Sequence, residues 1–161
     1  MSSITVVDQF TKELLASQDF FARSTRVLEE ADSNFRPKEG MMTAAEQVAH
    51  TAMTIDWFIE GASRPEGFDL DFEKAAKEME KVNSLAAARA MLDASYKKAV
   101  EFAQSKTPEQ LAAGLPAGPV MGGEPVGDIF WGIVEHTAHH RGVLTMYSRL
   151  LGKVPPMPYG G

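Results

Sequence analysis

Apolar residues recur at helical spacing along four long segments of this chain, and this periodicity limits the folds open to it. The first segment, residues 6–31, carries one such residue every seven positions, namely Val7, Leu14, Phe21 and Leu28. This spacing places them on one stripe of an amphipathic helix. No two segments show the alternation expected of paired strands. We therefore expect an all-α fold, a four-helix bundle with long irregular connections.

Local signals place the ends of the first helices. Residues 34–37 and Gly40 break the first helix. Thr43 and Glu46 fit a capping box, so the second helix starts there, and Gly61 is expected to be its C′ residue. Residues 107–110 resemble another capped start, with proline at the first helical position, and open only a short turn.

The second half of the chain contains two more long helices. A short helix is expected at 71–81 and a long one at 84–104. Residues 114–127 hold five glycines and three prolines, which indicates a long irregular connection of the kind that is often functional. The last helix begins near 126–128 and ends at Gly152, before a tail rich in proline and glycine.

Length, charge and the lack of cysteine narrow the classes of function. The 161 residues suit a single domain, 1–161. A net charge of −6 without a cluster of Lys and Arg argues against a nucleic-acid partner. No apolar stretch reaches the roughly 20 residues that cross a bilayer and no signal peptide is visible, so we expect no membrane partner and a cytoplasmic location. The absence of Cys excludes disulfides, a thiolate nucleophile and Cys-based metal sites.

Three of the four histidines interrupt apolar stripes. On the last helix, His136 and His140 lie one turn apart on a face otherwise formed by Ile129, Ile133, Val143 and Tyr147. His50 interrupts a similar stripe of the second helix, together with Met53 and Trp57. Buried neutral imidazoles need partners, and one metal ion can take the acceptor nitrogens of an i, i+4 pair together.

We therefore predict a three-histidine site, His50, His136 and His140, holding one divalent transition metal such as Zn, Ni or Fe. Three protein ligands leave a coordination position open for water or substrate, as in catalytic zinc sites. His139 lies roughly 60 to 100° around the helix from its neighbours and is expected to flank the site. No residue stands out as a catalytic acid or base; Glu46 and Asp56 are the candidates.

Several alternatives stay open at this point. A single buried histidine is more often hydrogen-bonded than bound to a metal. A di-iron carboxylate site would need Glu-x-x-His pairs, whereas Glu46 and Glu135 each have a histidine at i+4. Four large apolar residues are expected to lie in the core rather than in a substrate pocket: Met53, Trp57, Phe130 and Trp131. Arg141 and Arg149 are expected to be solvated or paired with carboxylates.

Residues 136–144 (HTAHHRGVL) resemble the H-x-x-H-H-R-G-Q-hydrophobic signature of the DinB-like family, also described as DinB/YfiT-like metalloenzymes. Upstream, residues 35–37 and 43–50 resemble the segment that leads to this family's first ligand. Val143 departs from the signature, where the family usually has Gln. The resemblance covers most of the chain and implies a four-helix bundle whose metal ligands correspond to His50, His136 and His140.

The resemblance also implies a function and partners. Members often form homodimers, and some are thiol-dependent transferases or isomerases that use bacillithiol or mycothiol. We therefore expect a metal-dependent enzyme with a small-molecule substrate, in the first instance an S-transferase that uses a low-molecular-weight thiol. The alternatives are a metal-dependent hydrolase and a non-catalytic metal-binding or stress-related bundle protein.

Overall fold

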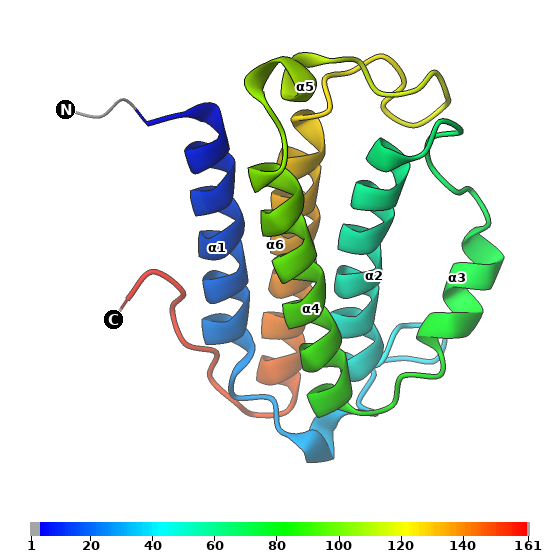
Figure 1. Cartoon of the computed structure of the whole chain (residues 1–161). Helices are drawn as coiled ribbons and strands as arrows, with labels where there is room; N and C mark the ends of the chain where they lie inside the picture. The colour runs from blue at the N-terminus through cyan, green and yellow to red at the C-terminus, as the bar shows by residue number, and fades with distance from the viewer. Residues whose placement is uncertain (1–3, 161) are drawn as a thin grey trace.

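Four long helices dominate the computed structural model, which describes residues 4–160 (Figure 1). They are α1 (Val6–Thr25), α2 (Ala44–Ser63), α4 (Leu85–Gln104) and α6 (Asp128–Leu150). The shorter elements are η1 (Glu30–Asp32), α3 (Phe72–Met79) and α5 (Pro108–Ala112). Within residues 4–160 there is no strand, only an isolated bridge between Gly114 and Pro125. The predicted all-α bundle is confirmed.

The long helices form a ring in which α1 and α2 lie diagonally opposite each other. Helix α1 packs against α4 and α6, and α2 packs against the same two helices. In Figure 1, α1 and α6 run from top to bottom, whereas α2 and α4 run from bottom to top. The bundle is therefore not a simple up-and-down one. The connection from α2 to α4, which includes α3, brings the chain back to the lower end and makes these two neighbours parallel.

The core is formed by the stripes that the periodicity predicts. Leu14 and Phe21 of α1 are at most 1% exposed, and Ile133 of α6 faces them from the same core. Burying a large apolar side chain of this kind stabilises the fold by roughly 1.5–3 kcal/mol. Tyr96 of α4 is also fully buried, and its hydroxyl lies 2.9 Å from Ser17 Oγ and donates to another hydroxyl, that of Thr137, at 3.0 Å. Its polar end is therefore satisfied.

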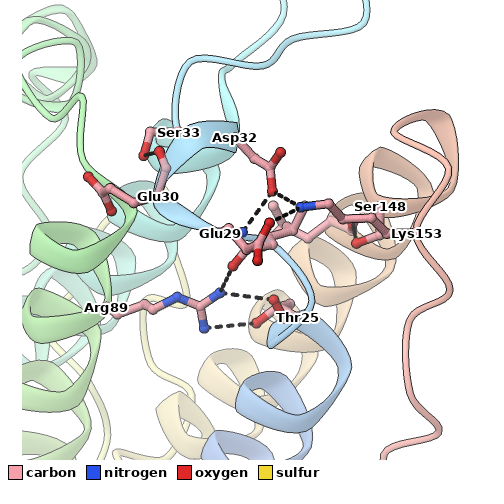
Figure 2. Close-up of polar contacts among 10 residues, drawn as sticks. Thr25, Glu29, Glu30, Asp32, Ser33, Arg89, Ser148 and Lys153 are labelled. Atoms are coloured by element: carbon pink, nitrogen blue, oxygen red, sulfur yellow. Dashed lines mark hydrogen bonds and ion pairs between the residues drawn. The ribbon is translucent and has the colours of Figure 1, made fainter.

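The end of α1 differs from the prediction. The helix ends at Thr25 rather than continuing to Ala31. Leu28 is buried as its place on the stripe suggests, but it lies in the connection that follows. The Arg89 guanidinium of α4 donates to the carbonyl oxygens of Thr25 at 2.9 Å and Leu28 at 3.3 Å (Figure 2). Arg89 thus donates to two carbonyl oxygens that would accept hydrogen bonds within the helix if α1 were longer.

The end of α2 differs as well. Gly61 lies inside the helix, which continues to Ser63, so it is not the C′ residue. A side chain at position 61 would overlap the ring of Phe68, which follows in the loop. The glycine is therefore required by this close approach of the loop. The capping box of Thr43 and Glu46 is present as predicted.

Three further helices begin within one residue of their predicted starts at 71, 84 and 107. Asp71, Ser84 and Thr107 cap α3, α4 and α5 through their side chains.

After α6, the Lys153 ammonium bridges Glu29 Oε2 at 3.0 Å and Asp32 Oδ2 at 2.5 Å, which fastens the C-terminal segment to the connection after α1 (Figure 2). None of the helices within residues 4–160 combines the length and the hydropathy that a membrane span requires.

Candidate metal centre

The imidazoles of His50, His136 and His140 meet between α2 and α6. The Nε2 atom of His136 lies 3.2 Å from the Nε2 atoms of both His50 and His140. One ring nitrogen from each residue lies within 4.8 Å of the others. Two histidines come from one turn of α6 and the third from the antiparallel helix packed against it. The structure therefore brings together the three residues that the stripes single out.

A chain of hydrogen bonds fixes the ring of His140. The Tyr147 hydroxyl donates to the carbonyl oxygen of Met42 at 2.8 Å, so it is free to accept from Gln47 Nε2 at 3.4 Å. That orientation directs the Gln47 Oε1 atom at His140 Nδ1, 2.5 Å away. Because an amide oxygen only accepts, Nδ1 carries the proton and Nε2 keeps its lone pair. The lone pair points toward His136.

Burial and mutual proximity keep the three imidazoles neutral. Desolvation, with a smaller contribution from His50 and His139, lowers the pKa of His136 to about 4. Desolvation and the neighbouring rings, His136 first, lower the pKa of His140 to about 3. The pKa of His50 is also lowered, mainly by burial. At neutral pH each ring therefore has a lone pair available for a metal ion.

The donor set fits a divalent transition metal. Nitrogen ligands 2.0–2.1 Å from a tetrahedral zinc ion are roughly 3.3 Å apart, which matches the two separations of 3.2 Å measured from His136. Gln47 fixes the Nε2 atom of His140 as an acceptor. In the tautomers of His50 and His136 that leave Nε2 unprotonated, three lone pairs converge, and a cation is the partner that satisfies them together. Nickel and iron also suit imidazole ligands.

The other residues considered for the site, His139, Glu46 and Asp56, lie in different surroundings. His139 is exposed, as expected for a flanking residue. Glu46 is buried in its capping box, where its Oε2 accepts the Thr43 N–H at 2.8 Å, and it does not line the cleft described below. Asp56 does line the cleft, and its Oδ2 pairs with the Lys98 ammonium at 3.0 Å.

A cleft of about 780 Å³ opens beside the three histidines. It lies between α2, α3 and α6, and both His50 and His136 form part of its wall. His140 does not line it and is buried behind them. Met121 of the long connection lines the cleft in a left-handed backbone conformation, with φ of 48°, which is uncommon for a residue other than glycine. A cleft of this size accommodates a small molecule.

The expectation that four large apolar residues lie in the core holds for only one of them. Phe130 is fully buried. Met53 and Trp57 are half-buried and line the cleft, and Trp131 lines it with 69% of its surface exposed. Met53 and Trp57 have the helical spacing of core residues, but the side of α2 that they occupy faces the cleft beside α3. Trp131 lies two residues from both Ile129 and Ile133, so it points away from their stripe.

The two arginines of α6 also differ from each other. Arg149 is exposed, as expected. Arg141 is half-buried and forms no ion pair within residues 4–160; its guanidinium carbon lies 5.9 Å from the ring centroids of Phe20 and Tyr159. Its stabilising contacts are therefore with aromatic rings rather than with carboxylates.

Sequence reasoning missed Gln47. It lies one turn before His50 on the same helix, and its side chain contacts a histidine of the facing helix instead. A polar residue one helical turn from a candidate ligand, inside an otherwise apolar segment, is the signal that could have identified it.

The fold and the site together define a class of protein, a helical bundle with a three-histidine centre at the inner end of an open cleft. The model of the DinB superfamily matches residues 13–144. This chain belongs to the DinB superfamily.

Two solved structures from Bacillus subtilis share the fold. A DinB-like protein, YjoA, is 19% identical over 92% of this chain and 96% of its own, with a TM-score of 0.68. YfiT, described as a probable metal-dependent hydrolase with an unusual four-helix bundle topology, is 18% identical over 95% of this chain and 93% of its own, with a TM-score of 0.72. Comparison with curated proteins gives no sequence match.

Proposed function

We propose that this protein is a mononuclear metal-dependent enzyme that acts on a small-molecule substrate bound in the cleft. His50, His136 and His140 would hold the metal. The observation that carries this proposal is the convergence of their ring nitrogens, with His136 Nε2 3.2 Å from the Nε2 atoms of the other two and His140 oriented by Gln47. The description of YfiT as a probable metal-dependent hydrolase supports it.

Each residue has a distinct part in this proposal. When bound, a divalent ion supplies Lewis acidity, which lowers the pKa of a water or thiol ligand and polarises an electrophile. His50 and His136 lie in the wall of the cleft, so a substrate bound in the cleft would reach the metal past these two residues. Gln47 holds the Nδ1 proton of His140 and so keeps its Nε2 unprotonated. The aromatic side chains of the cleft would exclude water from around the substrate.

We propose hydrolysis as the reaction, because it needs only water as the second reactant. Transfer to a low-molecular-weight thiol is the second candidate. The chain has no cysteine, so any thiolate would come from a co-substrate. The resemblance to thiol-dependent transferases supports this second candidate, and it is also the only support for a homodimer, which light scattering would measure.

Metal analysis followed by activity assays tests the proposal. Protein purified without chelators should hold about one metal ion per chain, and His136→Ala should not. A panel of activated esters and amides should turn over without added thiol, lose turnover on metal removal and regain it on metal addition. Turnover that needs a thiol would favour the transferase. The enzyme proposal fails if the protein retains no stoichiometric metal, or if metal removal lowers only the melting temperature.

A further inference from the structure

The charged side chains of the cleft are predominantly acidic. Six carboxylates and one ammonium group line it: Asp56, Glu60, Asp69, Asp71, Glu78, Glu135 and the lone Lys74. They come from α2, the loop after it, α3 and α6. A concave surface lined mainly by one sign of charge concentrates ions of the opposite sign.

Neighbouring lysines neutralise only part of this charge. Asp56 pairs with Lys98 at 3.0 Å and Glu78 pairs with Lys81 at 2.5 Å. With Lys74 this makes three ammonium groups against six carboxylates. Glu60 and Glu135 have no ion-pair partner within the described part of the chain. The cleft therefore keeps an excess of negative charge. Asp69 and Asp71 accept backbone N–H groups rather than pairing with a cation, and Glu60 and Glu135 lie on α2 and α6, the helices that carry the histidines.

One carboxylate of the cleft wall also has an unused acceptor. The Oδ1 atom of Asp56 is buried and has no hydrogen-bond donor, whereas its Oδ2 atom is paired with Lys98. A buried acceptor without a donor is costly to leave unsatisfied. Asp56 therefore adds negative charge beside the cleft, although this oxygen is itself buried.

Aromatic rings from three helices line the same cleft. Trp57 of α2 is fixed by a hydrogen bond from its Nε1 to the carbonyl oxygen of Asp69 at 2.7 Å, and its ring centroid lies 6.3 Å from that of Phe72. Phe72 of α3 is 61% exposed and Trp131 of α6 is 69% exposed. Exposed aromatic faces beside carboxylates form the surroundings in which proteins bind organic cations.

We propose that this cleft selects substrates with an apolar or aromatic body and a positive charge, such as aryl-alkyl ammonium compounds, and discriminates against substrates that carry several carboxylates. The proposal rests on the proposed function only in taking the cleft as the substrate site. The charge preference belongs to the cleft itself and can be measured without a metal. It also disfavours multiply anionic thiols as co-substrates.

Tryptophan fluorescence tests this preference directly, because the chain has two tryptophans and both line the cleft. The metal-free protein is titrated with benzyltrimethylammonium, benzyl alcohol and phenylacetate, which share one aryl group and differ in charge. The ammonium compound should bind with a dissociation constant about tenfold lower than that of phenylacetate. The difference should shrink as salt is raised from about 0.02 to 0.5 M, because exposed charges are screened.

Two variants and a matched control locate the effect. Glu60→Gln and Glu135→Gln should each reduce the preference for the ammonium compound several-fold. Asp19→Asn makes the same change in charge on α1, which is not among the helices around the cleft, and should leave the preference unchanged. Circular dichroism confirms that each variant is folded.

The outcomes separate this proposal from the proposed function. Equal or tighter binding of phenylacetate, no binding of any probe, or unchanged preference in both Gln variants overturns the charge preference, whatever the metal content. If the protein shows the charge preference but holds no metal, the enzyme proposal fails and this proposal stands.

Discussion

The Oε1 atom of Gln47 lies 2.5 Å from Nδ1 of His140, and this contact links the two helices that carry the three histidines. Gln47 belongs to α2, as does His50, whereas His140 belongs to α6 with His136. Each helix therefore contributes both to the histidine cluster and to the network around it. The relative position of α2 and α6 sets the geometry of the centre.

Replacing Gln47 should weaken metal binding without removing a ligand. Gln47→Ala leaves the His140 Nδ1 proton without its acceptor, so the ring is free to rotate or to change tautomer. We expect the affinity for Zn²⁺ to fall roughly 10- to 100-fold, as is usual when such a supporting partner is lost. Competition with a chelating dye measures this. Gln47→Glu, which keeps an acceptor oxygen, should bind Zn²⁺ nearly as well as the original protein.

A suitable comparison is Gln18→Ala, which removes an exposed hydrogen bond to Asp93 between α1 and α4, two helices that carry none of the histidines. It should leave the Zn²⁺ affinity unchanged. An affinity in Gln47→Ala equal to that of Gln18→Ala would show that Gln47 does not position His140.

Single substitutions should abolish stoichiometric metal binding at three of the four histidines and leave it intact at the fourth. His50→Ala, His136→Ala and His140→Ala should each lose stoichiometric metal, because two nitrogen ligands hold a divalent ion much more weakly than three. His139→Ala should retain it, since that side chain is exposed. Elemental analysis of the four proteins, prepared in parallel without chelators, gives the answer. Retention of metal by any of the first three would remove that residue from the ligand set.

The Lys153 bridge should make the fold sensitive to acid. Burial raises the pKa of the Asp32 carboxyl, but hydrogen bonds from the Lys153 ammonium and the Glu29 amide lower it by more, so the net pKa lies below its usual value. A carboxyl with a lowered folded pKa stabilises the fold above about pH 4 and loses this effect as the pH falls through the folded value.

Lys153→Met removes the ammonium and leaves burial to dominate, so the pKa of Asp32 should rise. Stability at neutral pH should then fall, and the acid unfolding midpoint should move to higher pH. Urea unfolding followed by circular dichroism between pH 2 and 7 measures both effects. Lys97→Met, whose partner Glu101 is 3.9 Å away at an exposed site, should shift neither. An unchanged acid midpoint in Lys153→Met would contradict this account.

Periodicity and capping signals were sufficient to predict the four long helices and the inward position of each of the three histidines, because these depend on spacing within one helix. Contacts between distant segments were not predictable in this way. Leu28 continues the stripe of α1, yet Arg89 of α4 takes up the carbonyls that end the helix at Thr25. Met53 and Trp57 have core-like spacing, but they are only half-buried because they face the cleft beside α3. Which faces are covered depends on tertiary packing.

Two glycines of α6 offer a last test of that packing. Gly132 is buried against α2, and a Cβ atom there would lie 2.7 Å from Phe58 Cζ and 2.9 Å from Cε1. Gly142 is exposed, and a Cβ atom there would meet nothing within 4 Å. The same substitution at the two positions should therefore have opposite effects.

Gly132→Ala should destabilise the protein by about 1–3 kcal/mol, because the new Cβ atom forces the packed Phe58 ring out of its position. Gly142→Ala should stabilise it by roughly 0.5–1 kcal/mol, since alanine costs less backbone entropy in a helix and clashes with nothing. Urea unfolding of the metal-free proteins measures both. Because Gly132 and Phe58 line the cleft next to the histidines, Gly132→Ala should also weaken Zn²⁺ binding, whereas Gly142→Ala should not. Equal stability of the two variants would mean that α2 and α6 do not approach each other as closely as this structure places them.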